Sequence, residues 1–393
     1  MRLILLLSLV GAVLLLAACR ASAPAGPARA LRVATFNVSL YDVRDGGLIA
    51  RLEADDARAR KLAAVIQRQR PDLLLLNEFD FDAGGRAADL FQQRYLQVGQ
   101  FGEAPIHYPF RYFAPVNTGV PSGMDLDRDG KVGGGNDAFG FGLHPGQYGM
   151  LVLSRHPIDL RGVRTFQAFA WKDLPGAQSP IDPATGEAWY PPEVWSRLRL
   201  SSKSHWDVPV RTPLGIVHFL VHHPTPPVFD GPEDRNGRRN HDEIRFWAEY
   251  LSQPDAPWLC DDTGRCGGLP ADALFVIAGD HNADPVDGDS HGDPMARLLQ
   301  HPRVLPHAAP ESRGAVAASL RDGGANLAHR GPAAQDTGDF GAKVGNLRVD
   351  YVLPSRGLRV DGGGVFWPAP GEPGADWLDA SDHHLVWLDL ARD

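Results

Sequence analysis

Short apolar runs that end in a polar or charged residue recur along the chain from residue 31 onward. Asp72–Glu78 contains four consecutive leucines and ends in an acid, which is typical of a central strand buried on both faces. Ala54–Gln69 and His241–Leu251 instead carry apolar residues at helical spacing, and Pro71 prevents the first helix from continuing. Six further segments have the length and composition of strands: Leu31–Asn37, Gly149–Ser154, Gly215–His223, Leu274–Asp280, Leu347–Leu353 and His384–Leu390. This mixture predicts a layered α/β fold, and no linker-like stretch divides residues 31–393, so we expect one domain there.

The first thirty residues have the features of an export signal. Arg2 precedes an apolar stretch, Leu3–Leu16, which is short for a membrane span and is followed by small residues. The tetrapeptide Leu16-Ala17-Ala18-Cys19 resembles a bacterial lipoprotein box, which implies that Cys19 is lipidated and becomes the first residue of the mature chain. An ordinary signal peptide with a chance cysteine is the alternative. We interpret residues 1–18 as a lipoprotein signal peptide and residues 19–30 as a tether.

Arg20 and the remaining cysteines bear on the cellular compartment in which we expect the protein. Arg20 is not the aspartate associated with inner-membrane retention, so we expect an anchor in the outer membrane, facing the periplasm or the cell surface. Cys260 and Cys266 are the two remaining cysteines, and in an oxidising compartment their spacing suits a small disulfide loop. Zinc prefers four ligands, and these two cysteines have no third candidate nearby, so we interpret them as a disulfide.

The composition is that of a globular protein with an acidic surface. Apolar residues make up 43% and charged residues 22% of the 393 residues, and the formal net charge is −9. Because such a surface repels polyanions, we expect nucleic acid only as a substrate at a locally positive metal site, and not as a tightly bound partner. We expect a monomer.

Polar residues stand at the ends of several expected strands. They are Asn37, Glu78, His222, His223, Asp280, Asn282, Asp350, Asp382 and His383. Each alone has an ordinary structural explanation, such as a turn, a cap or a solvated strand end. A charge beside an apolar run is costly unless it is paired or metal-bound, so the whole set predicts a shared site.

These residue types suit phosphoester hydrolysis, which needs a divalent cation, an activated water and donors that stabilise the transition state. Glu78, Asp382 and Asn37 supply oxygen ligands of the kind that Mg²⁺ or Mn²⁺ prefers. A histidine held by an aspartate makes a general base whose tautomer the carboxylate fixes.

Five short motifs follow one another along the chain: Ala34-Thr35-Phe36-Asn37, Asn77-Glu78, Gly279-Asp280-His281-Asn282-Ala283-Asp284, Arg348-Val349-Asp350-Tyr351 and Ser381-Asp382-His383. In this order they resemble the motifs of the endonuclease/exonuclease/phosphatase superfamily. That superfamily includes pancreatic-type DNases, abasic-site endonucleases, sphingomyelinases and inositol-polyphosphate phosphatases. The resemblance runs from about Leu31 to Leu390 and implies a four-layer α/β sandwich of two packed mixed β-sheets flanked by helices.

The resemblance also implies a role for each metal-site residue and for the residues that handle the attacking water. It implies that Glu78 is the principal metal ligand, that Asn37 lies beside it, and that Asp382 contacts the metal or its water. It further implies that Asp280 orients or deprotonates the attacking water and that Asn282 donates to a phosphoryl oxygen.

Two histidines complete the implied site. His383 is the active-site histidine and is held by Asp350; whether this histidine or Asp280 is the base stays open. His223 is the histidine that contacts phosphate, with His222 as the alternative. Strand alternation lets only one of the two face the site, and His223 lies nearer the strand end.

The sequence departs from the family pattern at two positions. His281 replaces the usual phenylalanine, as a core replacement or an extra polar contact. Ser39 stands where some relatives keep a second acid near the asparagine, which favours one metal over two.

A Gly-rich insertion, Asn117–Tyr148, is a candidate lid or substrate loop. Within it, Asp125, Asp127 and Asp129 alternate as in the first half of an EF-hand loop. The glutamate expected at the twelfth position is missing, so a structural Ca²⁺ and a solvated acidic loop are both open.

The most consistent hypothesis is an exported lipoprotein that hydrolyses phosphoesters, with small organic phosphates as substrates. A DNase or RNase of the same fold and a non-catalytic binding lipoprotein are the rival hypotheses. The sequence lacks stretches in which Lys or Arg residues are interspersed with aromatic residues, which disfavours the nuclease. The retention of the whole catalytic set disfavours the pure binder.

Overall fold

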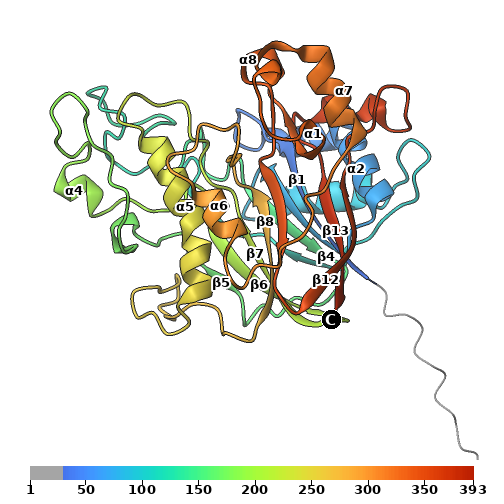
Figure 1. Ribbon diagram of the computed structural model, residues 1–393, viewed down its shortest axis with the longest axis horizontal. Helices are drawn as coiled ribbons and strands as arrows, with labels where there is room; N and C mark the ends of the chain where they lie inside the picture. The colour runs from blue at the N-terminus through green and yellow to red at the C-terminus, as the bar shows by residue number, and fades with distance from the viewer. Residues whose placement is uncertain (1–29) are drawn as a thin grey trace, which may run out of the picture.

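Two β-sheets pack face to face in the computed structural model, which describes residues 30–393 (Figure 1). One sheet has six strands in the order β12 (Leu358–Val365), β13 (Val386–Arg392), β1 (Leu31–Leu40), β2 (Leu73–Phe79), β4 (Met150–Ser154) and β3 (Phe110–Tyr112). The other has five strands in the order β11 (Asp350–Pro354), β8 (Leu274–Asp280), β7 (Gly215–His222), β6 (His205–Thr212) and β5 (Arg164–Thr165). Both are mixed, because β1 is parallel to β2 and β7 to β8 while the other pairs are antiparallel.

Helices cover the outer face of each sheet, and Figure 1 shows α5 and α6 on one side of the sheets and α1 and α2 on the other. The first sheet is covered by α1 (Gly47–Glu53), α2 (Ala57–Gln69) and α3 (Arg86–Leu90), which continues into a π-helical turn at Phe91–Leu96. The second is covered mainly by α5 (Arg235–Ser252) and α6 (Pro294–Leu299), with α4 (Pro192–Trp195) further out. The remaining elements are α7 (Arg313–Asp322), α8 (Gly341–Val344), the β9–β10 pair (Gly338–Asp339 and Asn346–Leu347) and short 3₁₀ turns at Trp171–Asp173, Gly324–Leu327, Ala333–Gln335 and Ala375–Ala380.

The side chains of β2 explain the four-leucine run. Leu74 and Leu76 point into the core beneath α1 and α2, whereas Leu73 and Leu75 point into the core between the sheets. Both faces of the strand are therefore buried, and alternation of apolar and polar residues is absent. The result is the four-layer α/β sandwich predicted from the sequence, and that prediction is confirmed.

Several boundaries differ from the prediction. The helix predicted at Ala54–Gln69 is α2, which starts after Asp56, whose side chain accepts a hydrogen bond from the backbone N–H of Ala59. The helix α1, which ends at Glu53, was not predicted. The helix α5 begins at Arg235, six residues before the predicted start, because its first turns are polar and lack the apolar periodicity. No helix within residues 30–393 has both the length and the apolar composition needed to cross a membrane. The predicted signal peptide and Cys19 lie outside the described residues.

Candidate active site

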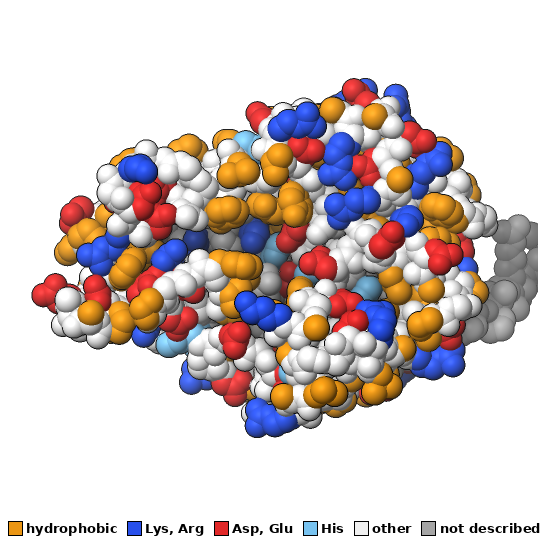
Figure 2. Space-filling view, turned by 90° about the horizontal axis from the view of Figure 1, so that it is seen from above, with side chains coloured by type: hydrophobic (Ala, Val, Ile, Leu, Met, Phe, Trp, Pro, Cys, Tyr) orange, Lys and Arg blue, Asp and Glu red, His pale blue; other side chains and the backbone are white. Residues whose placement is uncertain are grey.

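The strand ends of the two sheets meet at one end of the sandwich. Asn37 pairs with Asn77 across β1 and β2, and Asp350 pairs with Asp280 across β11 and β8. The Asn77 side chain, fully buried, joins the sheets, because its Oδ1 accepts the backbone N–H of Asp280 at 3.1 Å and its Nδ2 lies 3.4 Å from the carbonyl of His222. Figure 2 looks onto this end and shows acidic, basic and histidine side chains at the bottom of a hollow with a largely hydrophobic rim.

Asp280 is the centre of the cluster. Its Oδ2 accepts a hydrogen bond from Asn37 Nδ2 at 3.1 Å and lies 3.3 Å from His223 Nε2 and 3.6 Å from His383 Nε2. Its Oδ1 accepts the backbone N–H of Asn282 at 2.8 Å. Groups from β1, from the residues that follow β7 and β8, and from the segment before β13 therefore surround one carboxylate that is 1% exposed.

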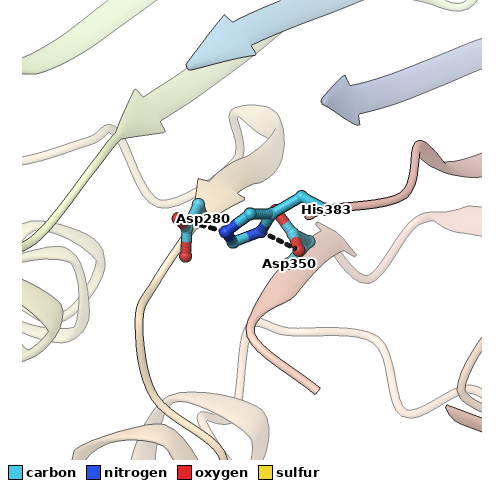
Figure 3. Close-up of side chains that lie close together, drawn as sticks. All are labelled: Asp280, Asp350 and His383. Carbon is cyan, nitrogen blue, oxygen red and sulfur yellow. Dashed lines mark hydrogen bonds and ion pairs between the residues drawn. The ribbon is translucent and has the colours of Figure 1, made fainter. Parts of the chain in front are cut away.

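A line of contacts holds His383 against Asp280 (Figure 3). The Nδ1 of His383 lies 2.9 Å from Asp350 Oδ2, and the same oxygen accepts a hydrogen bond from the Thr337 hydroxyl at 2.8 Å. Ser381 fixes the chain before the histidine, because its hydroxyl donates to the carbonyl of Asn37 at 2.8 Å. The ring is therefore held on one edge and presents Nε2 to Asp280.

Burial and neighbouring charges set the ionisation of this line. Burial alone would raise the pKa of Asp280, but His383 and His223 hold it well below its usual range. Burial would lower the pKa of His383, but Asp350 and Asp280 raise it well above its usual value. Burial raises the pKa of Asp350 to about 6 against the opposing effect of His383, and burial together with Lys203 lowers the pKa of His223 to about 4. The cluster therefore combines an ionised carboxylate, a cationic imidazole and a neutral imidazole.

Glu78 and Asp382 lie beside this centre. Glu78 is half-buried at the end of β2, and burial raises its pKa, with Asp382 adding to the effect and His383 opposing it. Ser39 Oγ lies 3.4 Å from Glu78 Oε2. The charge of the exposed Asp382 acts on the half-buried Glu78. Two neighbouring carboxylates are a suitable donor set for a hard divalent cation, and Glu78 and Asp382 would hold it. Asn37 lies next to them, but its Nδ2 donates to Asp280 and its Oδ1 accepts the N–H of Ser39 at 3.1 Å, so it also orients the centre.

Another acidic group is close enough to bind a metal: Asp280, Asp350 and His383 bring one ligand atom each within 4.8 Å of one another. In this structure the histidine already hydrogen-bonds one carboxylate and faces the other. The group therefore suits proton transfer better than metal binding.

The two adjacent histidines point to opposite sides of β7. His223 faces Asp280, whereas His222 lies in a buried cluster with His205 and His281, with 3.2 Å between His222 Nδ1 and His205 Nε2. His281 packs its ring against Tyr351 and His222, which is the position of a core residue.

The backbone is strained around the site. Ser39, Glu78 and Asn282 have φ values of 46°, 57° and 50°, in the left-handed region that such residues seldom adopt. Strain of this kind persists only where surrounding contacts over-determine the chain, and it gathers at functional sites.

Three residues at the site were not given roles from the sequence. Lys203, 6% exposed, precedes β6; burial lowers its pKa, and the carboxylates of Glu243, Glu78 and Asp280 oppose that shift, so its ammonium group lies close to them. Asn77 and Thr337 hold Asp280 and Asp350. For Asn77 the signal was a polar residue inside an apolar run, whereas neither Lys203 nor Thr337 lies in an element that the pattern predicts.

Two sequence predictions outside the site can be placed. Cys260 and Cys266 are joined by a disulfide. In the acidic loop, the carboxylates of Asp125 and Asp127 lie close to that of Asp137 and not to that of Asp129. The backbone N–H of Asp129 donates to the carboxylates of Asp125 and Asp127. Asp137 already accepts the N–H groups of Leu126 and Gly133.

Comparison with known proteins agrees with this geometry. Residues 34–383 match the model of the Endonuclease/Exonuclease/phosphatase family, so the chain belongs to that family. A solved endonuclease/exonuclease/phosphatase from Beutenbergia cavernae is 20% identical with a TM-score of 0.51, over 93% of this chain and 72% of that one. A family protein from Leptotrichia buccalis is 13% identical (TM-score 0.47, 92% and 100% coverage), and sphingomyelinase C from Streptomyces griseocarneus is 18% identical (TM-score 0.44, 92% and 99%). No curated protein sequence is significantly similar to this one. The chain thus has the fold of the phosphoesterases of this superfamily.

Proposed function

We propose that the protein hydrolyses phosphoesters with the help of a divalent cation, and that small organic phosphates are its substrates. The observation that carries the proposal is the meeting of Asn37, His223, Asn282 and His383 around the single carboxylate of Asp280. Membership of the family supports the reaction class.

Each residue has a part in the proposed reaction. A divalent cation held by Glu78 and Asp382, either Mg²⁺ or Mn²⁺, would neutralise charge on the phosphoryl oxygens. Asp280 and His383 form the proton-transfer pair: one takes the proton of the attacking water and the other protonates the leaving oxygen.

Positive and hydrogen-bonding groups also lie around Asp280. Lys203, His223 and the amide of Asn282 are placed to donate to the phosphoryl oxygens, where charge grows in the transition state. The Asn282 amide now donates to the carbonyl of Pro224 at 3.2 Å and lies 3.4 Å from Asp280 Oδ2, so these weak contacts can be exchanged for a substrate oxygen.

The test is a substrate panel in Mg²⁺ or Mn²⁺: a chromogenic phosphodiester, a phosphomonoester and supercoiled plasmid. We expect turnover of a small ester and no nicking of plasmid. Nicking at a comparable rate would favour the nuclease, and metal binding without any turnover would favour a binding protein. Glu78→Gln, which keeps the shape of the side chain and removes its charge, is the control that must abolish turnover.

We further propose, from residues 1–19, that the protein is exported and anchored by a lipid on Cys19 in the outer membrane, and that it acts as a monomer. Metabolic labelling with a fatty acid tests the anchor: Cys19→Ser should lose both the label and membrane fractionation. Light scattering of the soluble domain tests the monomer.

A further inference from the structure

Three aromatic side chains extend from the carboxylates of the site toward the surface. The ring centroids of Tyr41 and Tyr148 are 4.4 Å apart, and those of Tyr148 and Phe141 are 6.4 Å apart. Phe141 is 55% exposed, so the outer end of the row is open to solvent.

The inner end of the row lies against the proposed cation site. Tyr41 follows β1, four residues after Asn37, and burial together with the nearby carboxylates of Glu78 and Asp382 raises its pKa. Burial, Tyr41 and Glu78 likewise raise the pKa of Tyr148 to about 12. The rings therefore lie within reach of the organic substituent of a phosphoryl group bound by the cation that these carboxylates would hold.

The two tyrosines come from distant segments and are fixed by one buried carboxylate. Asp80, 6% exposed, accepts the backbone N–H of Asp42 at 2.8 Å and that of Tyr148 at 3.0 Å. Gln147 Nε2 and His144 Nε2 also lie 2.9 and 3.0 Å from the carbonyl of Asp42. The insertion is thereby tied to the loop after β1.

The backbone at Tyr148 shows that this placement is enforced. Its φ is 56°, and it lies between Gly146 and Gly149, where a Cβ atom would come within 2.5 Å of the Phe81 carbonyl and 2.7 Å of the Phe79 carbonyl. Backbone strain of this kind persists only where surrounding contacts over-determine the chain, and it gathers at functional sites, which supports a role for the position of Tyr148.

We propose that Tyr41, Tyr148 and Phe141 form a subsite that binds a planar aromatic group of the phosphoester, so that the Gly-rich insertion selects the organic part of the substrate. This proposal rests on the phosphoester function above and names its substrate class. Aromatic rings bind one another in tilted and offset geometries, which the spacing of this row allows.

Equilibrium binding tests the subsite without turnover. Calorimetry in Mn²⁺ compares methylphosphonate, phenylphosphonate and the 5′-phosphonate analogue of thymidine 5′-phosphate, which share a non-hydrolysable anionic head and differ in the organic group. We expect phenylphosphonate to bind about tenfold more tightly than methylphosphonate, as stacking on one or two rings would give. If the affinity of the thymidine phosphonate exceeds that of methylphosphonate by at least as much, the aromatic group is a nucleobase. If only phenylphosphonate binds more tightly, it is a simple aryl group.

Substitution of the exposed ring tests the subsite directly. Phe141→Ala should reduce the tenfold preference to about twofold or less while methylphosphonate binds unchanged. Phe101→Ala is the matched control, because Phe101 is 56% exposed and packs on Trp377, outside the residues placed at the site; it should keep the preference. Equal affinity for the two phosphonates in the wild type, or a preference that survives Phe141→Ala, would overturn the subsite. Failure of all three anions to bind would instead contradict the phosphoester site itself.

Discussion

Thr337 offers a direct way to perturb the histidine without touching it. Its hydroxyl donates to Asp350 Oδ2 at 2.8 Å and accepts the backbone N–H groups of Val349 and Asp350 at 3.0 Å each, and the residue is 2% exposed. Thr337→Val keeps the shape and removes all three hydrogen bonds. Asp350 Oδ1 has no hydrogen-bond partner among the described residues, so the variant leaves this buried carboxylate with His383 as its main partner.

The magnitude follows from these contacts. A hydrogen bond to a charged group contributes about 1.5–3 kcal/mol, and each buried N–H left without an acceptor costs about 1–3 kcal/mol. After partial relaxation we expect the free energy of unfolding to fall by about 3–5 kcal/mol, a large part of the 5–15 kcal/mol typical of a domain. Because Thr337 acts through Asp350, kcat should fall by about 10- to 100-fold with little change in KM.

Urea unfolding and steady-state kinetics of the small ester measure both effects. Thr337→Ser keeps the hydroxyl and loses only a methyl group, so it should retain kcat within about threefold. Wild-type kcat in Thr337→Val, or an equal loss of kcat in both variants, would show that the hydroxyl does not position the catalytic pair.

Three further predictions follow from buried charge. Lys203→Met should lower kcat/KM by about 100- to 1,000-fold, since it removes a positive charge aimed at the transition state, and Lys203→Arg should restore part of it; kinetics that match the wild type would exclude this role. Burial and neighbouring acids raise the pKa of Asp336 to about 8, above its value in the unfolded chain, so this carboxyl increasingly destabilises the fold as pH rises from about 4 through 8. Asp336→Asn should therefore raise the free energy of unfolding by about 1–3 kcal/mol at pH 9 and leave it unchanged at pH 4; a gain at pH 4 would contradict the assignment. Burial lowers the pKa values of His205, His222 and His281, so these neutral histidines stabilise the fold above pH 6.5 and lose that effect in acid. The free energy of unfolding should therefore drop by up to about 4 kcal/mol per pH unit below pH 6, with uptake of about three protons on unfolding. A flat profile from pH 7 to 4.5 would show that the three histidines are not buried in the neutral form.

The sequence predicted the central strands well, because both faces of β2 and β8 are buried and give continuous apolar runs. It did not predict β6, in which Asp207, Pro209 and Arg211 hide the pattern; there the buried Asp207 is paired with the Tyr250 hydroxyl at 2.6 Å and His218 Nδ1 at 2.7 Å. It did not predict β12 either, because Gly362–Gly364 has low strand propensity and is held by pairing with β13.

The residues of the candidate site also fall into those that the sequence predicts and those that it does not. Acids and amides that directly follow apolar strands, such as Glu78 and Asp280, could be found because strand ends share one edge of a sandwich. Lys203, Thr337 and Tyr148 could not, since they reach the site through irregular segments whose path depends on contacts such as those of Asp80.

The proposed mechanism requires that Glu78 and Asp382 hold the divalent cation beside Asp280. Anomalous diffraction from crystals grown in Mn²⁺ tests it most directly. We expect a peak about 2.0–2.3 Å from a carboxylate oxygen of Glu78, which disappears in Glu78→Gln. A peak between Asp280, Asp350 and His383, with no peak at Glu78, would contradict this assignment of the metal ligands.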